Sequence, residues 1–337
     1  MPANLTPAYK AAEARYRHAS DPEDRLDALR GMLRAIPKHK GTEHLQADIK
    51  ARIKELSDEL AGPRKGGART GPATVVRPEG AGQIALLGPP NTGKSALHAR
   101  ATGSHAEVGE YPFTTQYPMP GMMPVHDVAI QLVDLPPIAV EHPVPWISNA
   151  LRPADGCLLV VDLSEPDCVE RVLALHDLLS ERRTELIATW PTDGPEVEGG
   201  RDVFTTFLPT LLVAGKADRL PDPTEELAVL EELTGVTYPF MAVSAQTGQG
   251  LDDLATWLFD HLGVVRVYTK IPGKDPDMDR PYTVRAGATV GHVAELVHRE
   301  IAATLAYARL WSDDGFEVRQ VGRDHIVDDG DIVELHV

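Results

Sequence analysis

One short segment of the sequence has the residue types of a phosphate-binding loop. It reads GPPNTGKS over residues 88–95 and fits the spacing G-x-x-x-x-G-K-[S/T]. Glycines at both ends let the backbone bend so that its N–H groups point at phosphate oxygens. The lysine would reach the β- and γ-phosphates, and the final hydroxyl would bind Mg²⁺. An ordinary glycine turn is the alternative. The residues expected to hold phosphates are Gly88, Asn91, Thr92, Gly93, Lys94, Ser95 and Ala96.

The elements around this loop must be a strand before it and a helix after it. Short apolar runs alternate with helical segments from residue 82 to 263, which predicts an α/β domain with a mainly parallel sheet and helices on both faces. A polar insertion is expected at 189–202. The predicted strands are 83–88, 128–134, 156–163, 209–216 and 238–245, and the predicted helices are 94–103, 166–183, 224–235 and 250–263.

The two ends of the chain differ from this central part. Apolar residues repeat at helical spacing in two stretches between residues 21 and 60, which predicts a helical hairpin. The C-terminal segment has strand-like pieces at both ends and a helical run over 289–311. The expected organisation is a helical hairpin (1–62), a linker rich in Gly, Pro and Arg (63–81), the P-loop domain (82–263) and a small mixed domain (264–337).

Composition narrows the classes of protein that fit. The chain has 337 residues and a net charge of −17, its apolar runs are too short to cross a bilayer, and its N-terminus lacks the apolar core of a secretion signal. With two cysteines, a reducing cytoplasm without membrane contact is expected. Only residues 1–80 are basic, with 15 Lys and Arg against 11 acidic side chains, so nucleic-acid contact is expected there; a solvated helix surface is the alternative.

Two later segments resemble the guanine-recognition elements of the small-GTPase superfamily. GKAD (215–218) and VSAQTG (243–248) each follow a predicted strand, where the superfamily usually has N-K-x-D and S-A. The resemblance implies that Asp218 accepts the N–H donors of guanine and that Lys216 lies over the base. Ser244 and Ala245 would position a backbone N–H for the guanine oxygen. Gly215 replaces the asparagine that braces this loop, so we expect weaker binding with specificity retained through Asp218.

The segment EYPFTTQYPMPG (110–121) lies where a first switch belongs and, with the phosphate loop, resembles the Obg-like branch of GTPases. The resemblance implies that Thr115, with Thr114 as the second choice, completes the Mg²⁺ shell beside Ser95, while Asp134 holds a Mg²⁺-bound water. Lys94 and Thr115 would take part in catalysis. A proline-rich loop with local turns is the alternative. Asn91 resembles the asparagine of GTPases that bind K⁺, although it could equally be a turn residue.

The stretch QLVDLPPIAV (131–140) departs from the pattern of a second switch. The family reads D-L-P-G, and here Pro137 replaces the glycine whose N–H bonds the γ-phosphate. Proline has no N–H and a fixed φ, so that contact cannot form. Ile138 stands where a water-orienting glutamine is often found. We therefore predict that GTP and GDP bind with similar affinity and change residues 134–148 little.

Residues 265–337 carry VRVYTKIPGKDPDMDRPYTV, YARLW and VGRDHIVDDGDIVELHV, which closely resemble the TGS domain of the developmentally regulated GTP-binding protein family. The resemblance covers most of the chain, without the inserted domain of eukaryotic members. It implies a β-grasp C-terminal domain, ribosome or rRNA association and slow GTP hydrolysis. Because no residue is placed like a nucleophile for covalent catalysis, we expect direct attack by water, stimulated by a regulatory protein partner or a cation. A non-hydrolysing adaptor that docks on ribosome or RNA through the TGS domain and N-terminal helices is the alternative. Asp218 disfavours an ATPase.

Overall fold

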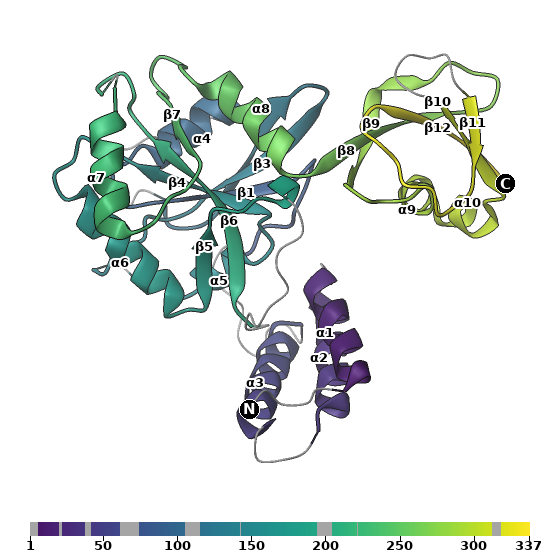
Figure 1. The fold of residues 1–337 in the computed structure, drawn as a ribbon, viewed down its shortest axis with the longest axis horizontal. Helices are drawn as coiled ribbons and strands as arrows, with labels where there is room; N and C mark the ends of the chain where they lie inside the picture. The colour runs from purple at the N-terminus through teal and green to yellow at the C-terminus, as the bar shows by residue number, and fades with distance from the viewer. Residues whose placement is uncertain are drawn as a thin grey trace, which may run out of the picture. The chain divides into compact units, whose positions relative to one another are not determined.

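The computed structural model describes residues 6–19, 22–37, 42–60, 74–104, 115–141, 143–193, 204–220, 222–311 and 318–337 (Figure 1). The chain divides into two compact units. One contains the N-terminal helices together with Phe204, and the other contains the remaining described residues from 74 onward. Within the described part of the chain, no helix is long and apolar enough to cross a membrane.

The N-terminal unit has three helices where two were predicted. The predicted hairpin is present as α2 (Pro22–Ala35) and α3 (Glu43–Leu60), and α1 (Pro7–His18) precedes it. Thr6 begins α1, since its hydroxyl accepts a hydrogen bond from the Tyr9 N–H at 3.1 Å. Tyr9 and Ala12 are buried beside the leucines of α2. Their spacing is helical, but an alanine-rich stripe has little contrast in hydrophobicity.

A distant residue completes the core of this unit. Phe204 is buried in it and lies edge-to-face against Tyr16, with ring centroids 6.3 Å apart. Residues 194–203, which contain most of the predicted insertion, lie outside the described residues, as does most of the predicted linker. Phe204, just after the predicted insertion, therefore contributes to the helical core, while β6 of the other unit begins two residues later at Thr206.

The central sheet of the larger unit confirms the predicted α/β class. Its strand order is β2-β3-β1-β4-β6-β5, with β7 also paired to β6, and all neighbours are parallel except β2 and β3. β5 pairs with the first half of β6 and β7 with the second half. The bounds are β1 Gln83–Leu87, β2 Met119–Val125, β3 Val128–Asp134, β4 Gly156–Val161, β5 Thr184–Ile187, β6 Thr206–Ala214 and β7 Phe240–Ala242.

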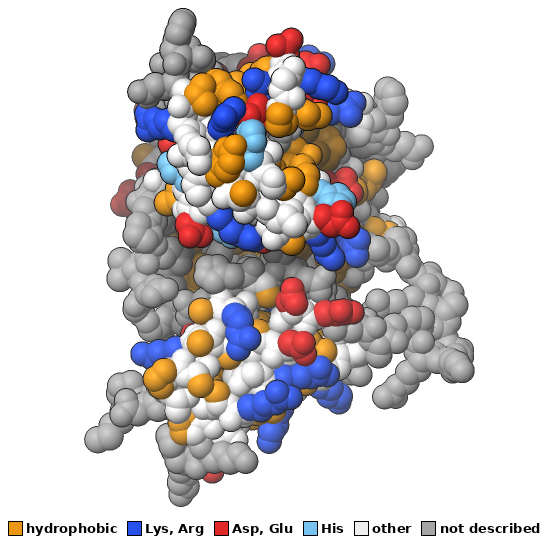
Figure 2. Space-filling model, turned by 90° about the vertical axis from the view of Figure 1, so that its right-hand side faces the viewer, with side chains coloured by type: hydrophobic (Ala, Val, Ile, Leu, Met, Phe, Trp, Pro, Cys, Tyr) orange, Lys and Arg blue, Asp and Glu red, His pale blue; other side chains and the backbone are white. Residues whose placement is uncertain are grey.

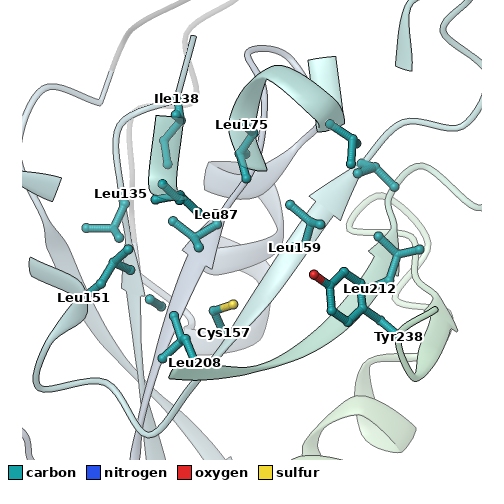
Figure 3. Close-up of a cluster of buried hydrophobic side chains, with 14 of the residues drawn as sticks. Leu87, Leu135, Ile138, Leu151, Cys157, Leu159, Leu175, Leu208, Leu212 and Tyr238 are labelled. Carbon is teal, nitrogen blue, oxygen red and sulfur yellow. The ribbon is translucent and has the colours of Figure 1, made fainter. Parts of the chain in front are cut away.

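Helices cover both faces of this sheet. Leu87 and Leu159 point to the face covered by α5, α6 and α7, where Figure 3 shows them beside Leu135 and Ile138. Their neighbour Leu86 points to the opposite face, toward α4 and α8. Because both faces are buried, the central strands read as continuous apolar runs. The helices are α4 Lys94–Thr102, α5 Ile147–Leu151, α6 Cys168–Ser180, α7 Thr224–Thr234 and α8 Leu251–His261, with a 3₁₀ turn at Pro191–Asp193.

The C-terminal residues form a second sheet with strand order β11-β10-β12-β8-β9, as expected for a β-grasp domain. One prediction was wrong here: residues 307–311 form strand β10 rather than the end of a helix. Ala308 and Leu310 are buried on either side of exposed Arg309, which is the two-residue period of a strand. The elements are β8 Val264–Lys270, β9 Asp277–Arg285, α9 Val290–Val297, α10 Arg299–Thr304, β10 Tyr307–Trp311, β11 Val318–Val321 and β12 Asp331–His336.

Candidate functional site

The GPPNTGKS segment connects β1 to α4 in the conformation expected of a phosphate loop. Gly88 has a φ of 147°, and a Cβ there would lie 2.2 Å from the Val160 carbonyl oxygen. Gly93 has a φ of 93° and is the N-cap of α4. Asn91 is exposed with a φ of 63°, a left-handed conformation that asparagine tolerates better than most residues. The backbone between the two glycines is thus free to turn its N–H groups toward an anion at the N-terminus of α4.

Lys94 lies inside this loop rather than on its surface. The residue is buried, and its Nζ donates a hydrogen bond to the Pro89 carbonyl oxygen at 2.6 Å. Burial lowers the pKa of Lys94 to about 8, although the charge of Asp134 acts in the opposite direction. A buried ammonium held by one carbonyl oxygen is under-compensated, so an anionic ligand would stabilise its charged form.

The three predicted magnesium positions converge although they lie up to 39 residues apart. The Ser95 Oγ donates to Asp134 Oδ2 at 2.6 Å, and the Thr115 Oγ1 donates to the same oxygen at 3.1 Å. The two hydroxyls are themselves 3.1 Å apart. Asp134 Oδ1 is buried and has no hydrogen-bond partner among the described residues. Two hydroxyls and an unsatisfied carboxylate oxygen are ligands of the hard type that Mg²⁺ prefers. Thr114 lies outside the described residues.

A cavity of about 170 Å³ is lined both by residues of the phosphate loop and by residues predicted to bind the base. Asp218 lies on its wall, and its Oδ1 accepts a hydrogen bond from Ser244 Oγ at 2.5 Å. Ser244 is fully buried, so it holds the carboxylate from behind. Asp218 itself is exposed, so it would be desolvated only when a ligand covers it. The predicted residues on the cavity wall are Thr92, Gly93, Ala96, Lys216, Asp218 and Ala245.

Sequence reasoning missed one carboxylate behind this cavity. Asp162, directly after β4, lies 2.7 Å from the Lys216 Nζ and is buried. Its Oδ1 also accepts hydrogen bonds from the backbone N–H and the hydroxyl of Ser164. The sequence feature that could have identified Asp162 is its position directly after a buried strand, at the same edge of the sheet as Asp134.

The residues after Asp134 are folded into the core. Pro136 and Pro137 are buried, and Ile138 packs among the apolar side chains drawn in Figure 3. The Ile138 N–H donates to the Gly88 carbonyl oxygen at 3.3 Å, which ties this segment to the first residue of the phosphate loop. The Ile138 side chain therefore faces the hydrophobic core rather than a bound phosphate.

Two family models match the chain. Residues 83–190 match the family described as 50S ribosome-binding GTPase, and residues 265–337 match the TGS domain. Together these matches span the phosphate loop, both segments predicted to be switches, and the second sheet.

Several known proteins align with this chain over most of its length. A GTP-binding protein of Methanocaldococcus jannaschii is 27% identical over 93% of this chain and 92% of its own length. Developmentally-regulated G-protein 2 of Arabidopsis thaliana is 26% identical over 93% of this chain and 90% of its own. The solved structure of the Schizosaccharomyces pombe YchF GTPase is similar in fold, with a TM-score of 0.54 and 13% identity over 79% of this chain and 100% of that one.

Proposed function

We propose that this chain, a homologue of the developmentally regulated GTP-binding proteins with a GTPase domain and a C-terminal TGS domain, hydrolyses GTP slowly by direct attack of water. The observation that carries the proposal is the meeting of Lys94, the Ser95–Thr115–Asp134 cluster and the Asp218 cavity around one loop. In this proposal residues 82–263 form the GTPase domain and residues 264–337 the TGS domain, preceded by the helices of 1–62 and a linker at 63–81.

Each part of the site has a separate task in this proposal. Lys94 and the loop N–H groups bind the phosphates, and Asp218 and Lys216 bind guanine with the Ala245 backbone. Ser95, Thr115 and, through a water, Asp134 would hold Mg²⁺, which when bound supplies positive charge beside the phosphates. Since Ile138 is buried in the core, catalysis rests on positioning and on charge stabilisation by Lys94, which predicts slow intrinsic turnover.

A second candidate function is a non-hydrolysing adaptor that docks on the ribosome or rRNA. Pro137 and Ile138 favour it, because a switch packed into the core is not arranged for turnover. On the face drawn in Figure 2, basic side chains lie among acidic and apolar ones, so the RNA contact of this candidate rests on the basic N-terminal 80 residues, in a cytoplasmic setting. A regulatory protein could act at the same complex.

Single-turnover hydrolysis separates these two candidates. Radiolabelled GTP would be mixed with excess protein, with and without ribosomes, in K⁺ or in Na⁺. The GTPase proposal expects slow hydrolysis that ribosomes or K⁺ accelerate, and a K⁺ effect lost in Asn91→Ala would support cation binding at Asn91. If the rate of GTP hydrolysis equals the rate without protein under all of these conditions, the GTPase proposal is wrong and the non-hydrolysing adaptor is the candidate that remains.

The two guanine nucleotides are expected to bind with similar affinity, within about threefold, because Pro137 cannot supply the hydrogen bond to the γ-phosphate. Competition against a fluorescent GDP would compare GDP with a non-hydrolysable GTP analogue. Pro137→Gly restores an N–H and is expected to favour the analogue by up to about tenfold, while Pro136→Ala serves as the matched control. A strong preference of the wild type for the analogue, or closure of residues 134–148 only with it, would contradict the prediction.

Affinity for GDP is expected to fall as the pH rises above about 8. In the free protein, burial lowers the pKa of Lys94 to about 8, so the ammonium loses its proton above that pH. Phosphate oxygens would raise that pKa again, so binding takes up a proton between the two values. Calorimetry at pH 8.5 in two buffers of different ionisation enthalpy would measure this uptake. Circular dichroism would verify that the protein stays folded, and zero uptake would refute the prediction.

A further inference from the structure

The loop that carries Lys216 is fixed at its backbone but lacks the usual asparagine. The Gly215 N–H donates to the Val161 carbonyl oxygen at 2.8 Å, and the Ala217 N–H donates to the Val243 carbonyl oxygen at 3.2 Å. Between them, Lys216 has a φ of 58°, which is unusual for a residue with a side chain. The backbone of this loop is therefore attached to the last residue of β4 and to the residue that follows β7.

Position 215 has no room for a side chain. A Cβ on Gly215 would lie 2.7 Å from the Thr92 carbonyl oxygen and 3.4 Å from Val160 Cγ1. The base-binding loop thus packs directly on the phosphate loop, backbone against backbone. An asparagine at this position would push the two loops apart. Gly215 is therefore required by the close packing of these loops, and is more than the loss of an asparagine side chain.

The side chain of Lys216 is held at its far end by Asp162. The two charged atoms are 2.7 Å apart, and the Asp162 side chain is 4% exposed. Ser164 fixes the other carboxylate oxygen of Asp162 through its N–H and its hydroxyl. Although burial raises the pKa of Asp162, the adjacent ammonium of Lys216 and the hydrogen bonds from Ser164 lower it, and the pKa lies below its ordinary value. The carboxylate is thus charged and oriented before any ligand binds.

Asp162 acts on the cavity only through its neighbour. Lys216 is one of the described residues that line the cavity, whereas Asp162 is not among them. A lysine stem has four rotatable bonds, and anchoring its ammonium removes most of that freedom in advance of binding. The stem is then held against the wall on which the base would rest.

We infer that Asp162 is a positioning residue for Lys216, and that this ion pair, together with the packing of Gly215 on Thr92, replaces the asparagine brace of the guanine site. The inference rests on the proposed guanine binding. If so, the apolar stem of Lys216 is already in place to contact the face of the base before the base binds. This contact does not depend on which polar groups the base carries at its edge.

The test compares Asp162→Asn with wild type for two ligands, GDP and IDP, which differ by the guanine amino group. Asp162→Asn is expected to weaken both by the same factor, about tenfold, because a cover on the ring face does not read that amino group. KM for GTP should rise by a similar factor with kcat within about twofold, since ground-state and transition-state binding are affected alike. Asp167→Asn is the matched control, because Asp167 lies in the same connection as Asp162, pairs with Arg171 of α6 instead of Lys216, and is half exposed.

A double-mutant cycle shows whether the effect passes through the lysine. Lys216→Met alone should weaken GDP binding at least as much as Asp162→Asn does. The double variant should bind GDP no more weakly than Lys216→Met. Gly215→Ala should also weaken GDP rather than improve it, with melting temperature recorded to detect global damage. GDP affinity of Asp162→Asn within twofold of wild type, or multiplicative effects in the cycle, would overturn the inference. Wild-type protein that does not bind GDP would overturn both this inference and the proposed function.

Discussion

Replacing Lys94 with alanine is expected to weaken GTP and GDP binding by about a hundredfold or more and to abolish measurable GTP turnover. The ammonium is buried at the N-terminus of α4, where its charge is worth more than at an exposed position. It is also the side chain that would contact the oxygens on which charge develops during transfer. Equilibrium binding of a fluorescent GDP and single-turnover hydrolysis would measure the two losses separately.

A matched control separates loss of the ammonium from general damage. Lys274→Ala removes an exposed lysine from the connection between β8 and β9 and should leave both measurements unchanged. Because Lys94 donates to the Pro89 carbonyl oxygen, the alanine variant also loses one internal hydrogen bond, so its melting temperature must be recorded. Full GTP turnover in a folded Lys94→Ala protein would refute the GTPase assignment.

The parts of the fold that could be predicted are those whose pattern is set by burial alone. Strands such as β1 and β4 are covered on both faces, and helices such as α6 and α8 carry one apolar stripe. β2 was missed because MPGMMPV contains two prolines and a glycine. Such a sequence is tolerated there since β2 pairs with β3 alone, at the edge of the sheet.

Position in the sheet also explains the error at residues 307–311. YARLW has apolar residues at spacings compatible with a helix or a strand, and such short runs cannot be resolved by period. Pairing decides the outcome, since β10 lies between β11 and β12 and forms a ladder with each. A sequence alone does not state which strands will be available as neighbours.

Site residues could be predicted where a local motif places them, and were missed where only tertiary contacts do. Ser95, Thr115 and Asp134 were named from separate segments, and the fold brings the start of α4, the segment before β2 and the end of β3 together so that their oxygens lie within hydrogen-bonding distance of one another. Asp162 belongs to no such motif, and its role follows from an ion pair across two strand ends. The tight packing of Gly215 on Thr92 is likewise a matter of distance between two loops.

Replacing Asp218 with asparagine is expected to weaken GDP and GTP by about a hundredfold and to create a preference for xanthine nucleotides. Guanine presents two N–H donors on one edge, and a carboxylate accepts both. An asparagine amide keeps one acceptor and gains one donor, which matches xanthine, where a carbonyl replaces the amino group. Ser244 already donates to Asp218 Oδ1, so the amide would turn its oxygen toward Ser244 and remain in place.

Competition among GDP, XDP and ADP for the wild type and the variant would measure this change. Asp222→Asn is the control, since Asp222 is exposed four residues later and accepts from Thr224 at the start of α7, a task that asparagine also performs. XDP binding tighter than GDP in Asp218→Asn, and only there, would establish that this carboxylate reads the base. If the wild-type protein instead binds ADP more tightly than GDP, the cavity selects adenine. The assignment of guanine specificity would then be wrong, even if Lys94 is required for nucleotide binding.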